Sequence, residues 1–266
     1  KAKLKAPFPY FGGKSTVAPL VWSRLGDVPN YVEPFFGSGA MLLARPTRPK
    51  IETVNDADHF VSNFWRSIKL SPEATAEAAD WPVNETDLEA RHYWLVTEGK
   101  DRLATIMGDP DGHDPKVAGY WAWGMCSWIG SGFCSGTGPW RWNGAAWEKG
   151  DGGGVARQLP HMGGGRGINR QLPHMGGGRG VHILASFLEL SARLRDVRVC
   201  SGDWSRPLFP SITKLGTTGV FLDPPYGDTR TCDLYRTDSL SVYGEVTEWC
   251  LANGDNPGLR IALCGY

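Results

Sequence analysis

The chain has 266 residues, of which 41% are hydrophobic and 21% charged, and this ordinary globular composition excludes a largely disordered protein. No apolar run of about 18 residues is present to cross a membrane, and the N-terminus lacks the apolar stretch of a secretory signal. Six scattered cysteines favour reduced thiols in a cytoplasmic protein. The net charge of zero hides basic blocks at 1–50 and 140–181 and an acidic block at 71–114, compatible with a polyanionic partner or with solvated surface.

The first seventy residues are predicted to alternate helices and strands, the pattern of a parallel α/β sheet. Ser15 is expected to cap a first helix, in which Leu20 is one of the apolar residues at helical spacing. Strands are expected at 31–33 and 51–54. A glycine turn and a short helix follow the first strand, and a longer helix over 60–70 follows the second.

Residues 71–181 differ in composition from the first zone. They begin with an acidic helical stretch and continue into a segment rich in Trp and Gly, in which RQLPHMGGGRG at 157–167 is repeated at 170–180. Two copies are too few for a stacked repeat protein, so we expect long loops or a ribbon at the surface. The tryptophans at 121–128 are expected to pack in the core of this segment.

The α/β pattern resumes at His182. Apolar spacing predicts a helix from Ile183 to Leu194, followed by a short strand at 197–199. A buried strand is expected at 219–222 and a last core strand at 259–264. Because the sequence stops on this strand, we expect it to be part of a longer chain.

The strongest functional motif is DPPY at 223–226, directly after an apolar strand. In an open α/β sheet, ligands bind beyond the carboxyl ends of the strands, so this motif is expected where chemistry takes place. The Asp223 carboxylate and the Pro224 carbonyl can accept hydrogen bonds from an exocyclic amino group, and Tyr226 offers a flat face to a base taken out of its stack. A plain strand-ending turn is the alternative.

A second motif, EPFFGSGA at 33–40, joins an expected strand to a helix. Gly37 and Gly39 would let a ligand approach the backbone at the helix N-terminus. The third glycine of the dinucleotide fingerprint is missing, which disfavours a Rossmann dehydrogenase. At the end of the next strand, Asp56 can bind a ribose hydroxyl pair, although this acid or Asp58 could instead cap the following helix.

Two further sites are disfavoured by their spacing. The GKS at 13–15 ends like a Walker A loop, but Phe8 stands where that motif needs its first glycine, so an ATPase is a poor alternative. A zinc ion would have to draw its ligands from Cys126, Cys134, His161 and His174. These residues match no common zinc-ligand spacing, and no metal site is predicted.

Five motifs follow one another along the chain: PYFGGK at 9–14, EPFFGSG at 33–39, ND at 55–56, GDW at 202–204 and DPPY at 223–226. In this order they resemble the motifs of the Dam-like, alpha-group DNA adenine-N6 methyltransferases, and their wording is closest to phage and prophage members. The resemblance covers about residues 7–70 and 182–266.

The resemblance implies an α/β, Rossmann-like S-adenosylmethionine-dependent methyltransferase fold. Residues 1–70 and 182–266 would form a discontinuous catalytic domain, and residues 71–181 an inserted, loop-rich target-recognition domain. It further implies a cytoplasmic protein of a bacterial or phage-infected cell, whose partner is double-stranded DNA with a target adenine. We expect a monomer and leave a dimer open.

The resemblance also assigns roles to individual residues. Those implied for S-adenosylmethionine are Tyr10, Lys14, Glu33, Phe35, Gly37, Gly39, Asp56, Asp203, Trp204 and Asp223. Those implied for catalysis are Asp223, Pro224, Pro225 and Tyr226. Trp204 departs from the Phe that the family often has, but it keeps a flat ring for stacking.

Basic residues interleaved with glycine and tryptophan in the middle segment suit DNA phosphates and guanine edges. Those expected to contact DNA are Arg141, Arg157, Arg166, Arg170 and Arg179. The expected reaction is direct in-line transfer of a methyl group from S-adenosylmethionine to the N6 amino group of a flipped adenine. Cytosine-N4 methylation and a catalytically inactive DNA-binding relative are the alternatives.

Overall fold

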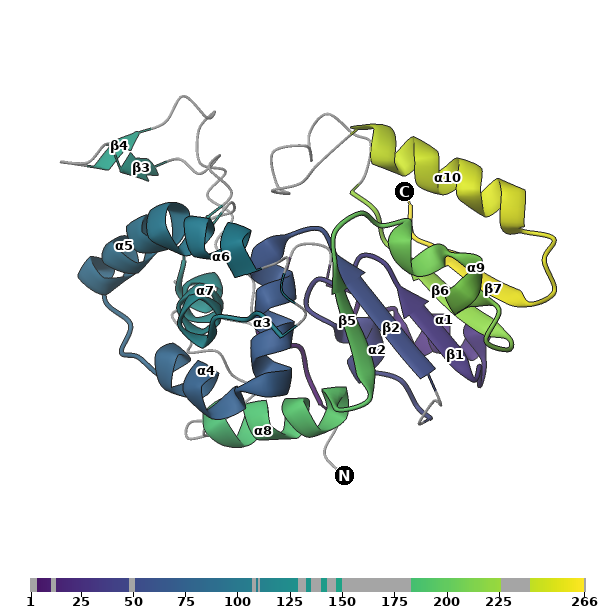
Figure 1. Ribbon diagram of the computed structural model, residues 1–266, viewed down its shortest axis with the longest axis horizontal. Helices are drawn as coiled ribbons and strands as arrows, with labels where there is room; N and C mark the ends of the chain where they lie inside the picture. The colour runs from purple at the N-terminus through teal and green to yellow at the C-terminus, as the bar shows by residue number, and fades with distance from the viewer. Residues whose placement is uncertain are drawn as a thin grey trace.

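Five parallel strands form the central sheet of the computed structural model (Figure 1). The residues that the structure describes are 4–10, 13–47, 51–106, 109, 111–128, 133–134, 140–142, 147–149, 183–225 and 240–265. The strands are β1 (Asn30–Glu33), β2 (Ile51–Asp56), β5 (Val197–Ser201), β6 (Thr218–Leu222) and β7 (Leu259–Leu263). Residues before and after the long middle segment thus contribute to one sheet.

The strand order across the sheet is β5-β2-β1-β6-β7, and each neighbouring pair is parallel. The chain builds outward from β1 through β2 to β5, and then returns to the other side of β1 with β6 and β7. In α/β sheets of this order, ligands bind beyond the carboxyl ends of the strands at the point where the direction of building reverses. Here that point lies between β1 and β6.

All five expected strands are present, but the side chains of the strand expected in the core at 259–264 are half-buried or exposed. Among the described residues, β7 pairs with β6 alone. β6 is the strand that is buried along its whole length, because it lies between β1 and β7.

The first helix, α1 (Ala18–Leu25), is present, but its expected cap is not. Val17 is the N-cap, no side chain caps the helix, and Pro19 lies within the first turn. Leu20 is 61% exposed, whereas Trp22 is buried and donates from Nε1 to the Met41 carbonyl at 2.9 Å. The buried side of α1 is therefore shifted from the one that the leucine spacing predicts.

Four helices pack together beside the sheet: α3 (His59–Leu70), α4 (Pro72–Ala79), α7 (Pro115–Ser127) and α8 (Ile183–Leu194) (Figure 1). The inward side of α3 consists of fully buried Phe64, Trp65 and Ile68. In α7, Trp121 and Trp123 are buried, as expected for core packing. Because α4 and α7 share one hydrophobic cluster with the sheet, the first part of the middle segment is built into the hydrophobic core of the sheet.

Three shorter helical elements continue from α4: α5 (Glu85–Trp94), the π-helical turn η1 (Leu95–Gly99) and α6 (Lys100–Ile106). α5 packs on α7 through Arg91, whose guanidinium lies 4.0 Å from the Tyr120 ring centroid and 4.6 Å from that of Trp123. A separate antiparallel hairpin consists of β3 (Trp140–Trp142) and β4 (Trp147–Lys149).

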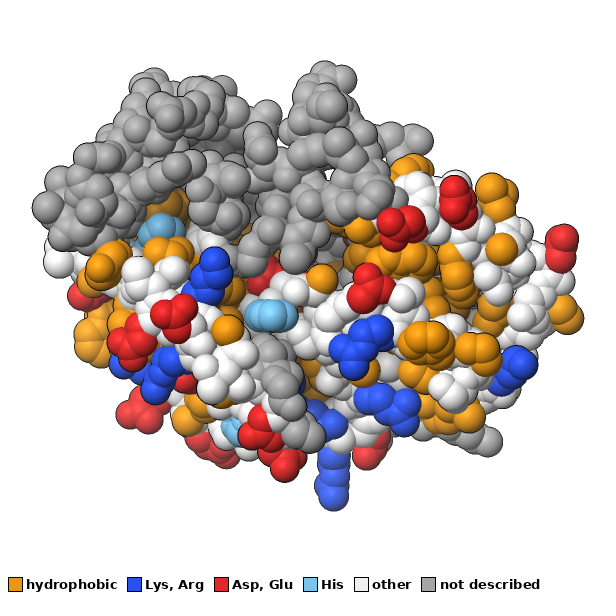
Figure 2. Space-filling model, turned by 45° about the horizontal axis from the view of Figure 1, so that its top comes forward, with side chains coloured by type: hydrophobic (Ala, Val, Ile, Leu, Met, Phe, Trp, Pro, Cys, Tyr) orange, Lys and Arg blue, Asp and Glu red, His pale blue; other side chains and the backbone are white. Residues whose placement is uncertain are grey.

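A second hydrophobic cluster forms on the other face of the sheet. The helical elements in it are α10 (Leu240–Asn253), the 3-10 turn η2 (Arg206–Leu208) and α9 (Pro210–Thr213). The short helix α2 (Ala40–Leu43) follows β1 and does not belong to this cluster. Val32 and Val220 face Val246 of α10 in this cluster, whereas Tyr31 and Phe221 face the first cluster, as alternation along a strand requires. Exposed apolar side chains gather toward the α9 and α10 end of the molecule (Figure 2).

Candidate active site

A cavity of about 400 Å³ opens at the carboxyl ends of β1 and β6. Ten of the residues expected in the site line it: Tyr10, Lys14, Glu33, Phe35, Gly37, Asp56, Asp203, Trp204, Asp223 and Pro225. They come from the N-terminal segment, the ends of β1, β2 and β6, and the turn after β5. The volume is within the range of about 300–1,000 Å³ that small-molecule sites occupy.

Four other lining residues are assigned no role from the sequence. Ser38 and Ala40 lie within the EPFFGSGA motif, Met41 follows it in α2, and Val242 belongs to α10. The first three accompany the glycine turn into the cavity wall. Val242 gave no signal, because no helix is predicted over 240–253 and the residue is an ordinary apolar one.

The glycine turn after β1 is shaped by two residues with positive φ angles. Gly37 has φ +48°, and a Cβ atom there would lie 2.8 Å from the Tyr10 ring. Gly39 has φ +70°, and a Cβ atom there would lie 2.9 Å from Trp65. Gly37 lines the cavity, whereas Gly39 lies beneath it as the N-cap of α2. Both positions therefore require glycine, but of the two only Gly37 lines the cavity.

Asp56, at the end of β2, receives two backbone hydrogen bonds. Its Oδ2 accepts from the Gly37 N–H at 2.8 Å and its Oδ1 from the Asp58 N–H at 2.9 Å. Burial, with a smaller contribution from the nearby Asp58, raises the pKa of Asp56 to about 7. The Asp58 carboxylate caps α3 by accepting from the Phe60 N–H at 2.8 Å. The structure thus assigns the capping role to Asp58 and leaves Asp56 in the cavity.

A flat apolar slot lies at the turn after β5. The rings of Trp204 and Phe35 are stacked, with centroids 6.2 Å apart and an interplanar angle of 17°. The neighbouring Asp203 carboxylate is exposed, lines the cavity and accepts from the Ser205 N–H at 2.9 Å. The slot therefore combines a ring surface with a carboxylate at its edge, which suits an aromatic ligand that carries an amino group.

Lys14 and Asp223 meet across the cavity. The Lys14 Nζ lies 2.7 Å from Asp223 Oδ2, which joins the N-terminal segment to the end of β6. Pro224 follows Asp223, is buried and does not line the cavity, whereas Pro225 does. Tyr226 lies outside the described residues. Asp223 and Pro225 of the DPPY motif thus line the cavity, and the Asp223 carboxylate is paired with the Lys14 ammonium.

Glu33 forms the buried floor of the cavity, where it is 2% exposed. The Tyr31 hydroxyl donates to Glu33 Oε2 at 2.9 Å. Burial raises the pKa of Glu33 well above its ordinary value, and the Asp223 charge adds to the increase. The floor therefore favours the neutral form of Glu33 and would favour its ionised form when a cation is bound beside it.

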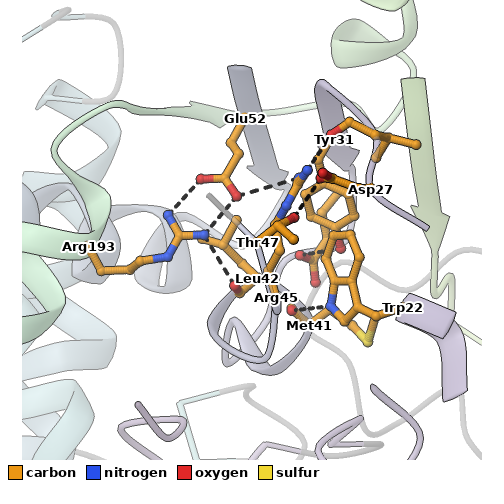
Figure 3. A network of polar contacts seen from close by, with 11 residues as sticks. Trp22, Asp27, Tyr31, Met41, Leu42, Arg45, Thr47, Glu52 and Arg193 are labelled. Atoms are coloured by element: carbon orange, nitrogen blue, oxygen red, sulfur yellow. Dashed lines mark hydrogen bonds and ion pairs between the residues drawn. The ribbon is translucent and has the colours of Figure 1, made fainter. Parts of the chain in front are cut away.

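An ionic network supports the cavity from behind (Figure 3). Arg193 of α8 donates to both carboxylate oxygens of Glu52 on β2, at 2.6 and 2.7 Å, and to the Leu42 carbonyl at 3.2 Å. The Arg45 guanidinium lies 3.7 Å from Glu52 and 4.8 Å from the Trp22 ring centroid. Because Leu42 belongs to α2, the short helix that follows the glycine turn, the network fixes α2 against β2 and α8.

Several predicted residues cannot be placed. Arg141 lies in β3, but its side chain is not described, and the other expected DNA contacts, Arg157, Arg166, Arg170 and Arg179, lie outside the described residues, as does the duplicated loop. Within the described part of the chain, no three acidic, His or Cys side chains are grouped to hold a metal ion. In the same residues, no helix is long and apolar enough to span a membrane.

Comparison with known proteins gives one family. Residues 10–106 match the model for the D12 class N6 adenine-specific DNA methyltransferases, a little over a third of the chain. The matched span includes the glycine turn and Asp56, but it ends before Asp203 and Asp223. None of the curated proteins compared with the chain matches it. The family match confirms the predicted activity, methylation of the adenine N6 amino group in DNA, and disfavours the cytosine-N4 alternative.

Proposed function

We propose that this DNA adenine-N6 methyltransferase binds S-adenosylmethionine in the cavity between β1 and β6 and methylates a flipped adenine beside Asp223, as a Dam-like enzyme. One observation carries the proposal: the Asp56, Asp203 and Asp223 side chains, which are far apart in sequence, line one cavity at the reversal point of the sheet. An enzyme that transfers a methyl group from a cofactor to a base needs the cofactor subsite and the base subsite side by side.

The lining residues fit the parts of the cofactor. Asp56 still has lone pairs for the ribose hydroxyls, because a carboxylate can accept about four hydrogen bonds and the Gly37 and Asp58 N–H groups take one position on each oxygen. The Phe35–Trp204 slot suits the adenine ring, with Asp203 for its amino group. Tyr10, Lys14, Glu33 and Gly37 would surround the methionine part. S-adenosylmethionine supplies an electrophilic methyl group on a cationic sulfur.

The chain's own contribution to methyl transfer is orientation and hydrogen-bond acceptance. The Asp223 carboxylate would accept a hydrogen bond from the N6 amino group, and the Pro224 carbonyl would accept the second one, which directs the nitrogen lone pair toward the methyl group. The Lys14 ammonium, 2.7 Å from Asp223 Oδ2, would hold the acceptor carboxylate in place. Orientation of two reactants can supply on the order of 7–11 kcal/mol of the rate acceleration. Tyr226 would stack on the flipped base.

DNA recognition is proposed for the second part of the middle segment. Residues up to Ser127 pack into the core shared with the sheet, and the expected arginine contacts all lie beyond them. Arg141 is placed on the β3–β4 hairpin, and Arg166 and Arg179 end the two copies of the duplicated sequence. Glycine-rich chain around cations can adapt to a groove, which supports assigning target recognition within 71–181 to this part.

Cofactor binding without DNA tests the proposal. We expect calorimetry to show one S-adenosylmethionine site per chain, and Asp56→Ala to weaken binding by about 1–3 kcal/mol, the scale of lost hydrogen bonds to a charged group. Asp27→Ala is the matched control, because Asp27 is exposed, lies before β1 and contacts Thr47 instead of the cavity. Equal affinities for the wild-type protein and Asp56→Ala would remove Asp56 from the site.

A further inference from the structure

Cys264 lies directly beside Asp223 at the end of the sheet. Leu222 of β6 pairs with Leu263 of β7, so the next residues on the two strands, Asp223 and Cys264, are also opposite one another. The Cys264 N–H donates to the Leu222 carbonyl at 2.8 Å, which extends the ladder by one residue. The Cys264 backbone is therefore as fixed as the strands themselves.

Because Asp223 and Cys264 are opposite one another at the ends of neighbouring parallel strands, their side chains point to the same face of the sheet, and the thiol, directly after β7, lies next to the Asp223 carboxylate as a donor. Burial and the nearby carboxylates of Asp223 and Glu33 raise the pKa of the thiol to about 11, although the Lys14 ammonium acts in the opposite direction. At neutral pH the thiol is protonated and can serve as a permanent donor. Asp223 is thus flanked by donors from two separate elements, Lys14 of the N-terminal segment and Cys264 after β7.

We propose that Cys264 is a positioning residue for methyl transfer, whose thiol fixes the rotation of the Asp223 carboxylate so that a lone pair faces the adenine amino group. The inference rests on the proposed function, in which Asp223 accepts from N6. A carboxylate held through one oxygen can still turn about its Cβ–Cγ bond, whereas donors from two rigid elements select one orientation. A thiol has no charge and donates weakly, so it orients Asp223 without neutralising it.

Three variants of the full chain test this role. We expect Cys264→Ala to lower kcat about 3- to 10-fold, the equivalent of one ordinary hydrogen bond, with KM for S-adenosylmethionine changed less than about twofold. Cys264→Ser keeps a donor and should restore kcat to within about twofold of the wild-type value. Cys250→Ala is the matched control, because Cys250 is a half-buried thiol on α10 whose pKa is raised by burial alone.

The pH profile separates positioning from packing. Loss of a donor to the ionised carboxylate is expected to raise the Asp223 pKa. The acid limb of the kcat–pH profile should therefore shift to higher pH by as much as about one pH unit in Cys264→Ala, and should return to its wild-type position in Cys264→Ser. A change of packing alone would lower the melting temperature of both variants and leave the acid limb in place. That result, or an unchanged kcat in Cys264→Ala, would overturn the proposal.

The reciprocal experiment uses Asp223→Asn and does not depend on activity. If the thiol faces the Asp223 charge, the pKa of Cys264, followed by alkylation and mass spectrometry of its peptide, should fall in this variant. An unchanged thiol pKa contradicts the inference about Cys264. Wild-type methylation by Asp223→Asn would instead contradict the proposed function, so the two failures can be told apart.

Discussion

Asp56 is half-buried at the cavity, and its proposed role in binding the ribose hydroxyls requires a charged carboxylate. The protein raises its pKa to about 7, whereas an Asp in an unfolded chain titrates near 3.9. This group therefore makes folding less favourable as the pH rises from about 4 to 7, because the folded state holds the proton more tightly than the unfolded state does. A ligand that donates hydroxyl hydrogen bonds to the ionised form would lower the pKa and release the proton.

The affinity for S-adenosylmethionine should consequently rise with pH. We expect an increase of about tenfold between pH 6 and 8, as Asp56 changes from mostly neutral to mostly ionised, with proton uptake by the buffer on binding. Asp56→Asn provides the control, because it retains the titration of the cofactor's own amino group. Calorimetry in buffers of different ionisation enthalpy measures both quantities. A wild-type pH profile that matches the Asn variant would show that Asp56 does not bind as a carboxylate.

At the residue scale, the predicted residues that follow strand ends, such as Glu33, Asp56 and Asp223, do line the cavity, because parallel strands bring their carboxyl ends to one edge of the sheet. The sequence does not separate Gly37, which faces the cavity, from Gly39, which packs on Trp65, because both need positive φ angles for different reasons. Contacts between segments distant in sequence are also missed. The Lys14–Asp223 ion pair and the place of the Cys264 thiol beside Asp223 depend on how the N-terminal segment and β7 meet β6.

The short helix α2 depends on groups outside itself. With only four residues, it cannot be stable alone, and its end is held by Trp22 at the Met41 carbonyl and by Arg193 at the Leu42 carbonyl. Arg193 also pairs with Glu52, which is 5% exposed. The support for the glycine turn thus comes from α1 and α8.

Arg193→Met should destabilise the protein by about 2–4 kcal/mol, because it leaves the Glu52 carboxylate buried with only the more distant Arg45 beside it. Urea unfolding monitored by circular dichroism measures the change. Arg195→Met serves as the control, since Arg195 is exposed just after α8. A loss below about 0.5 kcal/mol in Arg193→Met would mean that the network contributes little to the fold.

At the scale of elements, helices and strands with a clear apolar pattern in the sequence are predicted more successfully than those without one. The helix over 60–70 and the buried strand at 219–222 have strong apolar periodicity, and both are present. α10 is not predicted, because its sequence includes Gly244 and β-branched residues and has no clear apolar side. The partial exposure of β7, which pairs with β6 alone among the described residues, is not predicted by its own apolar sequence.

At the scale of the whole molecule, the strand order explains why the site is assembled from both ends of the sequence. β1 and β2 precede the long middle segment, β6 follows it, and the reversal between β1 and β6 brings Glu33 and Asp223 to one cavity. Alternating strands and helices predict a parallel sheet but not this order. The packing of α4 and α7 into the shared core is also a tertiary property that composition alone does not predict.

Transfer of a labelled methyl group to DNA tests the central claim most directly. Wild-type protein, S-adenosylmethionine with a labelled methyl group and DNA of mixed sequence should yield labelled N6-methyladenine after digestion to nucleosides. Asp223→Ala should lower the rate by on the order of 10²-fold or more, because it removes a preorganised charged acceptor, while cofactor affinity stays within a few fold. Label in cytosine, or a normal rate for Asp223→Ala, would contradict the account.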